Sequence, residues 1–106
     1  MTGLPIPTAS IAEFCRRWKV REFALIGSAL RDDFPASSDV DVVVTFAPDA
    51  EWDLFDVVRM REELAGIFGR DVDLIEEPAV RNPYVLASIR RTKRVLYAGG
   101  VVEGAR

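Results

Sequence analysis

The fold of this chain is decided by the stretch Gly27-Ser28-Ala29-Leu30-Arg31 and by Ser38-Asp39-Val40-Asp41-Val42-Val43-Val44, which follows it closely. The pattern predicts a strand end, a Gly-Ser turn, a short helix from Ser28 that ends before Pro35, a loop, and a second strand. The second strand opens with two carboxylates. Residues two apart on a strand share a face, so Asp39 and Asp41 point the same way and repel each other.

Two kinds of ligand suit this stretch. A hard divalent cation such as Mg²⁺ relieves the repulsion between Asp39 and Asp41, because it binds carboxylate oxygens. Gly27 and Ser28 suit a phosphate, because a helix N-terminus presents free N–H groups and glycine lets the backbone come close. A phosphate site beside a metal-binding carboxylate pair indicates phosphoryl or nucleotidyl chemistry.

Length and composition limit the alternatives. A chain of 106 residues predicts one domain, and a net charge of −3 makes nucleic acid an improbable direct partner. Cys15 is the single cysteine, so no internal disulfide forms, and the chain has no histidine to build a catalytic triad or a His-containing zinc site. No apolar run approaches membrane-spanning length, and residues 1–10 lack the basic start and long apolar core of a signal peptide, so we expect a cytoplasmic protein.

The remaining pattern predicts an α+β fold. Helices are expected over 10–18, with a capping box from Ser10 to Glu13, over 52–68, and from Asn82-Pro83; strands are expected over 20–26, 39–46 and 71–75, with a short edge strand over 95–97. The strand over 71–75 carries a second pair, Asp71 and Asp73. A strand–helix–strand crossover makes the second and third strands parallel, whereas the first must run antiparallel to the second. The result is a mixed sheet of three to four strands flanked by helices, in a domain over 1–98 with a flexible tail over 99–106.

Several side chains have both an ordinary and a functional interpretation. Arg31 is either a solvated charge or a clamp on phosphate oxygens, and its neighbours favour the clamp. A basic cluster (Arg90, Arg91, Lys93 and Arg94) is more simply a solvated helix end than a partner surface. Trp52 and Phe55 fit the core or its rim better than a base-stacking platform, and Cys15 fits the core better than a reactive thiol.

These motifs together resemble a known family. Gly27-Ser28 with Arg31, Ser38-Asp39 with Asp41, and Asp73 on a later strand resemble the minimal nucleotidyltransferases of the DNA polymerase beta superfamily, over nearly the whole chain. The likeness is greatest to small antitoxin-type members that partner a HEPN-domain toxin. The resemblance implies the nucleotidyltransferase fold.

The resemblance also implies roles for the residues. Asp39, Asp41 and Asp73 would be catalytic and would hold two Mg²⁺ ions, with Asp73 also taking the acceptor's proton. Gly27, Ser28, Arg31 and Ser38 would bind the nucleotide. The implied reaction moves AMP from ATP to a hydroxyl, usually of tyrosine, on the HEPN toxin. One alternative is a catalytically silent antitoxin that works by binding alone; another is a plain α/β domain with two acidic strand mouths. The sequence leaves the choice between homo- and hetero-oligomer open.

Overall fold

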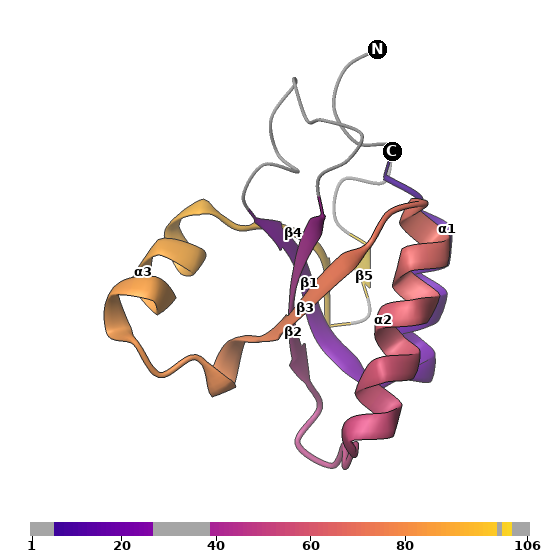
Figure 1. Ribbon diagram of the computed structural model, residues 1–106, viewed down its shortest axis with the longest axis horizontal. Coiled ribbons are helices and arrows are strands. Elements are labelled where there is room, and N and C mark those ends of the chain that lie inside the picture. The colour runs from indigo at the N-terminus through magenta and orange to yellow at the C-terminus, as the bar shows by residue number, and fades with distance from the viewer. Residues whose placement is uncertain (1–5, 27–38, 100, 103–106) are drawn as a thin grey trace.

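The computed structural model describes residues 6–26, 39–99 and 101–102. In chain order the elements are α1 (Thr8–Arg17), β1 (Val20–Ile26), β2 (Val40–Phe46), α2 (Leu54–Phe68), β3 (Val72–Glu76), the 3₁₀ turn η2 (Glu77–Ala79), α3 (Pro83–Thr92), β4 (Arg94–Ala98) and β5 (Val101–Val102) (Figure 1). Within these described ranges, no helix has both the length and the apolar character needed to cross a bilayer.

The sheet is mixed, as the sequence predicts. Its strand order is β3-β2-β1-β4-β5, with β1 antiparallel to β2 and to β4, and β2 parallel to β3 through the crossover helix α2. The expected α+β class and the antiparallel and parallel pairings are confirmed. The expectation that the strand near 95–97 lies at an edge is wrong, because β5 pairs with β4 on its outer side. Gly99 makes this return possible, since its φ of 57° is one that glycine adopts without strain.

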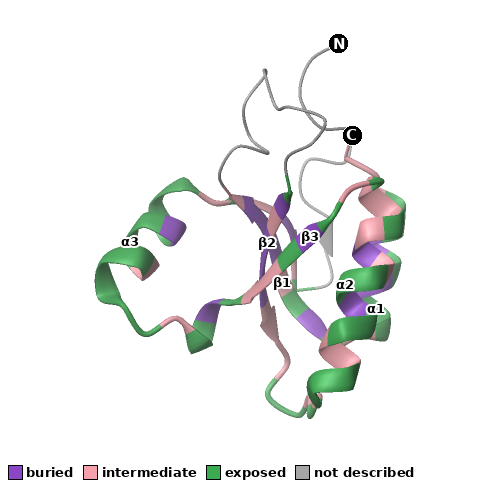
Figure 2. Cartoon of the chain, in the orientation of Figure 1, coloured by how far each residue is buried: buried purple, intermediate pink, exposed green. Residues whose placement is uncertain are grey.

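The hydrophobic core lies between one face of the sheet and the helices α1 and α2 (Figure 2). Alternation along the strands sends every second side chain into it, and β2 contributes Val40, Val42 and Val44. From the helices come Phe14 and Cys15 of α1 and Met60 and Leu64 of α2, all at most 1% exposed. Burial raises the pKa of Cys15 to about 12, which keeps the thiol protonated and supports its interpretation as a small core residue.

The helix ends differ in part from the expected ones. α1 begins at Thr8, and the capping box expected from Ser10 and Glu13 does not form, because the helix already starts two residues earlier behind Pro7. α2 has the capping box that the sequence reasoning missed: the Asp53 side chain accepts a hydrogen bond from the Asp56 N–H, and the Asp56 side chain accepts one from the Asp53 N–H. Gly69 ends α2 in the left-handed conformation, which glycine adopts readily.

Two tryptophans join the end of α1 to α2 and to the segment before it. The Trp52 indole N–H donates to the carbonyl of Trp18, and the Trp18 indole N–H donates to Glu63 on α2, each at 3.0 Å. Their rings pack edge to face with centroids 5.1 Å apart. Trp52 therefore packs against the core, as expected, whereas Phe55 is exposed.

α3 stands on the other side of the sheet from α1 and α2 and is held there by ion pairs (Figure 1). Lys93 Nζ donates to Glu77 at 2.7 Å and also to Glu22 of β1, and Arg90 donates to Glu77 at 3.2 Å. The Lys93 and Glu77 side chains are only 14% and 11% exposed. The solvated-end interpretation of the basic cluster is therefore wrong for Lys93, because two acidic side chains on the sheet and in η2 draw it inward.

Candidate functional site

The N-terminal ends of β2 and β3, which carry the aspartates, lie side by side at one end of the sheet. Asp41 of β2 and Asp73 of β3 are direct partners in the parallel register, and the Val40 N–H donates to the carbonyl of Asp71 at 2.9 Å. Neighbouring strands lie about 4.8 Å apart, so the two side chains on the same face are close neighbours. Asp39 immediately precedes β2.

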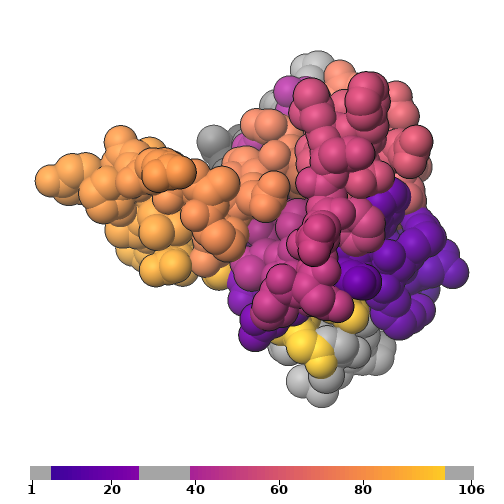
Figure 3. Space-filling model, turned by 90° about the horizontal axis from the view of Figure 1, so that it is seen from below, coloured from indigo at the N-terminus to yellow at the C-terminus, as the bar shows by residue number. Residues whose placement is uncertain are grey.

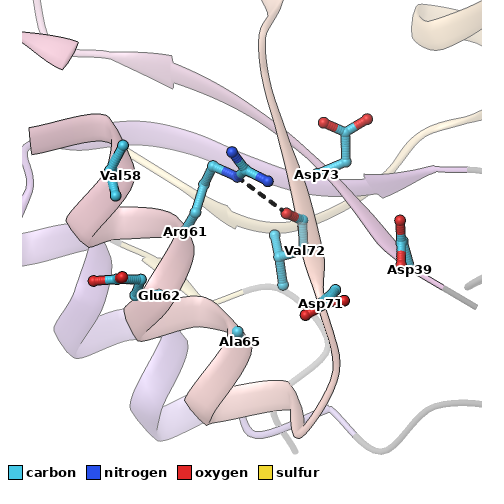
Figure 4. Close-up of a pocket in the computed structure, with 8 residues that line it drawn as sticks. All are labelled: Asp39, Val58, Arg61, Glu62, Ala65, Asp71, Val72 and Asp73. Carbon is cyan, nitrogen blue, oxygen red and sulfur yellow. Dashed lines mark hydrogen bonds between the residues drawn. The ribbon is translucent and has the colours of Figure 1, made fainter. Parts of the chain in front are cut away.

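Strand alternation decides which way these carboxylates point. Val40 and Val72 are buried among the core residues on the helix-covered face, so the next residues, Asp41 and Asp73, point to the opposite face. Figure 4 shows the Asp73 carboxylate on the other side of β3 from Val58 and Arg61 of α2. Asp41 is half-buried, whereas Asp39 and Asp73 are exposed and accessible to a ligand.

The cluster is electrostatically unfavourable without a cation. Burial raises the pKa of Asp41, and the negative charges of Asp73 and Asp39 raise it further. A cation bound beside Asp41 would offset the repulsion that its carboxylate meets from Asp73 and Asp39. Perturbed carboxylates of this kind concentrate at functional sites.

A hollow of about 620 Å³ opens beside these residues. Figure 4 draws the residues that line it: Asp39, Val58, Arg61, Glu62, Ala65, Asp71, Val72 and Asp73. Arg61 Nε donates to the carbonyl of Val72 at 3.4 Å, which places a guanidinium at the outer edge of β3. Among the described residues that line the hollow, Arg61 is the one cation, and its only sequence signal is a charge interrupting the apolar stripe of α2.

The predicted site residues divide into two groups. Asp41 and Asp73 are register partners on β2 and β3, and Asp39, directly before β2, lines the same hollow as Asp71 and Asp73. Gly27, Ser28, Arg31 and Ser38 lie outside the described residues. Ile26, the last described residue before position 27, has Asp41 as its register partner, so β1 ends beside the carboxylates. The roles of all seven residues stay predictions.

The donor chemistry of the site fits a hard divalent cation. Ionised carboxylate oxygens are the ligands that Mg²⁺ prefers, and mutual repulsion at Asp41 gives such an ion a favourable place to bind. Within residues 6–26 and 39–99, however, no group of three or more acidic, histidine or cysteine side chains is arranged closely enough to hold a metal ion. Asp41 and Asp73 are the pair best placed to begin such a site.

Comparisons with known proteins agree with the predicted resemblance. The family model described as "Nucleotidyltransferase domain" matches residues 9–96. A Methanocaldococcus jannaschii protein named "Putative protein adenylyltransferase MJ1379" is 36% identical over 73 residues, which are 69% of this chain and 73% of that protein.

Solved structures show the same fold. A structure described as "putative minimal nucleotidyltransferase" has a TM-score of 0.67 and 25% identity, over 82% of this chain and 86% of that one. A toxin–antitoxin crystal structure with AMP-PNP has a TM-score of 0.72 and 20% identity, over 88% of this chain and 74% of that one.

Proposed function

Because this chain belongs to the nucleotidyltransferase domain family, we propose that it transfers the AMP group of ATP to a hydroxyl, foremost of a tyrosine, on a partner protein. The partner we propose is a HEPN-domain toxin, so that the chain acts as its antitoxin. Support comes from the relative named as a protein adenylyltransferase and from the toxin–antitoxin structure that shares the fold.

One observation carries the proposal: Asp41 and Asp73 are register partners on parallel strands, and Asp39 precedes the first of them. This arrangement offers carboxylate oxygens from two strands at one exposed point on the sheet. Bound Mg²⁺ would neutralise the charge of the triphosphate there and polarise its phosphorus–oxygen bonds. Asp39, Asp41 and Asp73 are the residues that would hold it.

At the α-phosphorus of ATP, the reaction forms one phosphorus–oxygen bond and breaks another. The acceptor oxygen attacks the α-phosphorus of ATP, the bond from that phosphorus to the bridging oxygen breaks, and pyrophosphate leaves. The hydroxyl proton passes to an ionised carboxylate, for which Asp73 is suited because it is exposed beside the reaction site. Gly27, Ser28, Arg31 and Ser38 are proposed to hold the phosphates.

The proposal is tested by incubating the chain with Mg²⁺, the protein encoded by the adjacent gene as the candidate partner, and ATP labelled at the α-phosphate. We expect label on the partner and release of unlabelled pyrophosphate. ATP labelled at the γ-phosphate should leave the partner unlabelled, which separates AMP transfer from phosphate transfer. Replacing both Asp39 and Asp41 with asparagine should abolish labelling.

Asp71→Asn is the matched control, because Asp71 is another exposed carboxylate at the same strand mouth with no proposed role. It should keep most of the labelling. Labelling that survives the double change would overturn the proposed site. Tight binding of the partner without any transfer would favour the silent antitoxin instead.

A further inference from the structure

The charge of this chain is distributed unevenly. Five of its 14 lysines and arginines lie between Pro78 and Gly99, a segment without any Asp or Glu. The other nine are outnumbered by the 17 acidic residues, so the rest of the chain carries a net charge of −8. A basic segment on an acidic body suits contact with another acidic surface.

α3 presents this basic segment on a projecting helix (Figure 3). Its inner side holds Ile89, which is buried, and the ion pairs of Arg90 and Lys93 with Glu77. Its outer side carries Tyr84, Ser88 and Arg91 at helical spacing, with Val85 beside them. Tyr84 is 85% exposed and Val85 is 47% exposed. Among the described residues, Arg91 has no ion-pair partner.

The start of α2 has the complementary character. Leu54 and Phe55 are 74% and 73% exposed, and both are large apolar side chains. The exposed carboxylates Glu51 and Asp53 directly precede them. Figure 3 shows that α3 projects away from α2 of the same chain, so the two surfaces do not cover each other within one molecule.

We propose that these two surfaces bind each other between copies of this chain, so that the outer side of α3 (Tyr84, Val85 and Arg91) packs on the start of α2 (Glu51, Leu54 and Phe55) of a second copy. A two-fold axis would make the contact twice. A ten-residue helix is only about 15 Å long, so one such contact buries too little surface on its own. Two contacts are needed to approach the roughly 1,600 Å² that stable interfaces bury. The small side chains Ala87 and Ser88 let a second helix approach closely, and Tyr and Arg are typical interface residues. This inference does not depend on nucleotidyl transfer.

Sedimentation equilibrium of the purified chain over a concentration series tests the proposal. The wild type should form a dimer that weakens as salt is added, because opposite charges face each other. Tyr84→Ala and Phe55→Ala should each raise the dimer dissociation constant at least about tenfold. Both side chains are largely exposed, so the melting temperature of the monomer should not change.

Charge reversal gives the sharper measurement. Arg91→Glu and Glu51→Arg should each weaken the dimer, and the two changes together in one chain should restore it. Arg16→Glu, an exposed change of the same charge on α1, is the control and should have little effect. A wild type that stays monomeric at every concentration would overturn the proposal. So would equal effects of Arg91→Glu and Arg16→Glu, or a double variant no tighter than the single ones.

Discussion

Replacing Lys93 with methionine removes the charge that fastens α3 to the sheet while keeping a side chain of similar length. Lys93 donates to both Glu77 and Glu22, and its side chain is largely buried. Hydrogen bonds to charged groups contribute about 1.5–3 kcal/mol each. Glu77 keeps Arg90 as a partner and Glu22 is partly solvated, so the expected loss is about 2–4 kcal/mol rather than the full sum.

Thermal unfolding by circular dichroism measures this loss. For 106 residues, 1 kcal/mol corresponds to about 4–5 °C, so the melting temperature should fall by about 8–20 °C. Hydrogen exchange should also show faster exchange of the α3 amides, because α3 loses its main attachment. Lys19→Met is the matched control: its pair with Asp49 is exposed on both sides, and its loss should cost about 0.5 kcal/mol or less.

The pH dependence of the stability lost in Lys93→Met follows from the pKa values of Glu77 and Lys93. The hydrogen bond from Lys93, opposed by burial and aided by Arg90, holds the pKa of Glu77 below its ordinary value. Its stabilisation is therefore present above the unfolded-chain value of about 4.3 and is lost as pH falls through the folded value. Burial works against the charge of Lys93, but its bonds to Glu22 and Glu77 leave its pKa raised, so its contribution is lost as pH rises through that folded value. The reasoning fails if Lys93→Met costs no more than Lys19→Met at neutral pH.

Three further changes test other parts of the structure. Asp41→Asn should raise the melting temperature at neutral pH without divalent cations. The reason is that folding raises the pKa of Asp41, so the ionised carboxylate destabilises the fold at any pH above its pKa in the unfolded chain. Mg²⁺ should then raise the melting temperature of the wild type more than that of the variant, and equal responses would contradict the metal assignment. Leu64→Ala should cost about 2–5 kcal/mol in urea unfolding, because Leu64 is fully buried in the core; a cost below about 1 kcal/mol would contradict that packing. Gly69→Ala should cost about 1–2 kcal/mol, since alanine is strained at a φ of 71°, whereas Gly66→Ala in the same helix should be neutral or stabilising.

The sequence was sufficient for the sheet because its signals there are strong and local. Apolar alternation with carboxylates at two strand starts, joined by a crossover helix, leaves one arrangement of β1, β2 and β3, and the structure has it. The meeting of Asp41 with Asp73 then follows from parallel pairing alone.

Contacts between distant residues were not predictable in this way. Lys93 reaches Glu22, which is 71 positions away, and nothing near either residue indicates that pairing. Arg61 was visible only as a break in an apolar stripe, because its hydrogen bond to Val72 depends on how α2 lies along β3. The position of β4 inside the sheet depended on a two-residue strand after Gly99, too short to give a periodic signal.

The pairing of β2 with β3 has a consequence for how chains of this kind can vary in length. Val72 packs into the core and Asp73 points the other way, so a slip of β3 by one residue against β2 would exchange the two sides. Val72 would then lie beside Asp41 at the N-terminal end of β3, and an aspartate would be buried in the core. Insertions or deletions between Gly69 and Val72 are therefore tolerable only where the turn absorbs them and leaves this register unchanged, and hybrid domains assembled from related chains must keep that register.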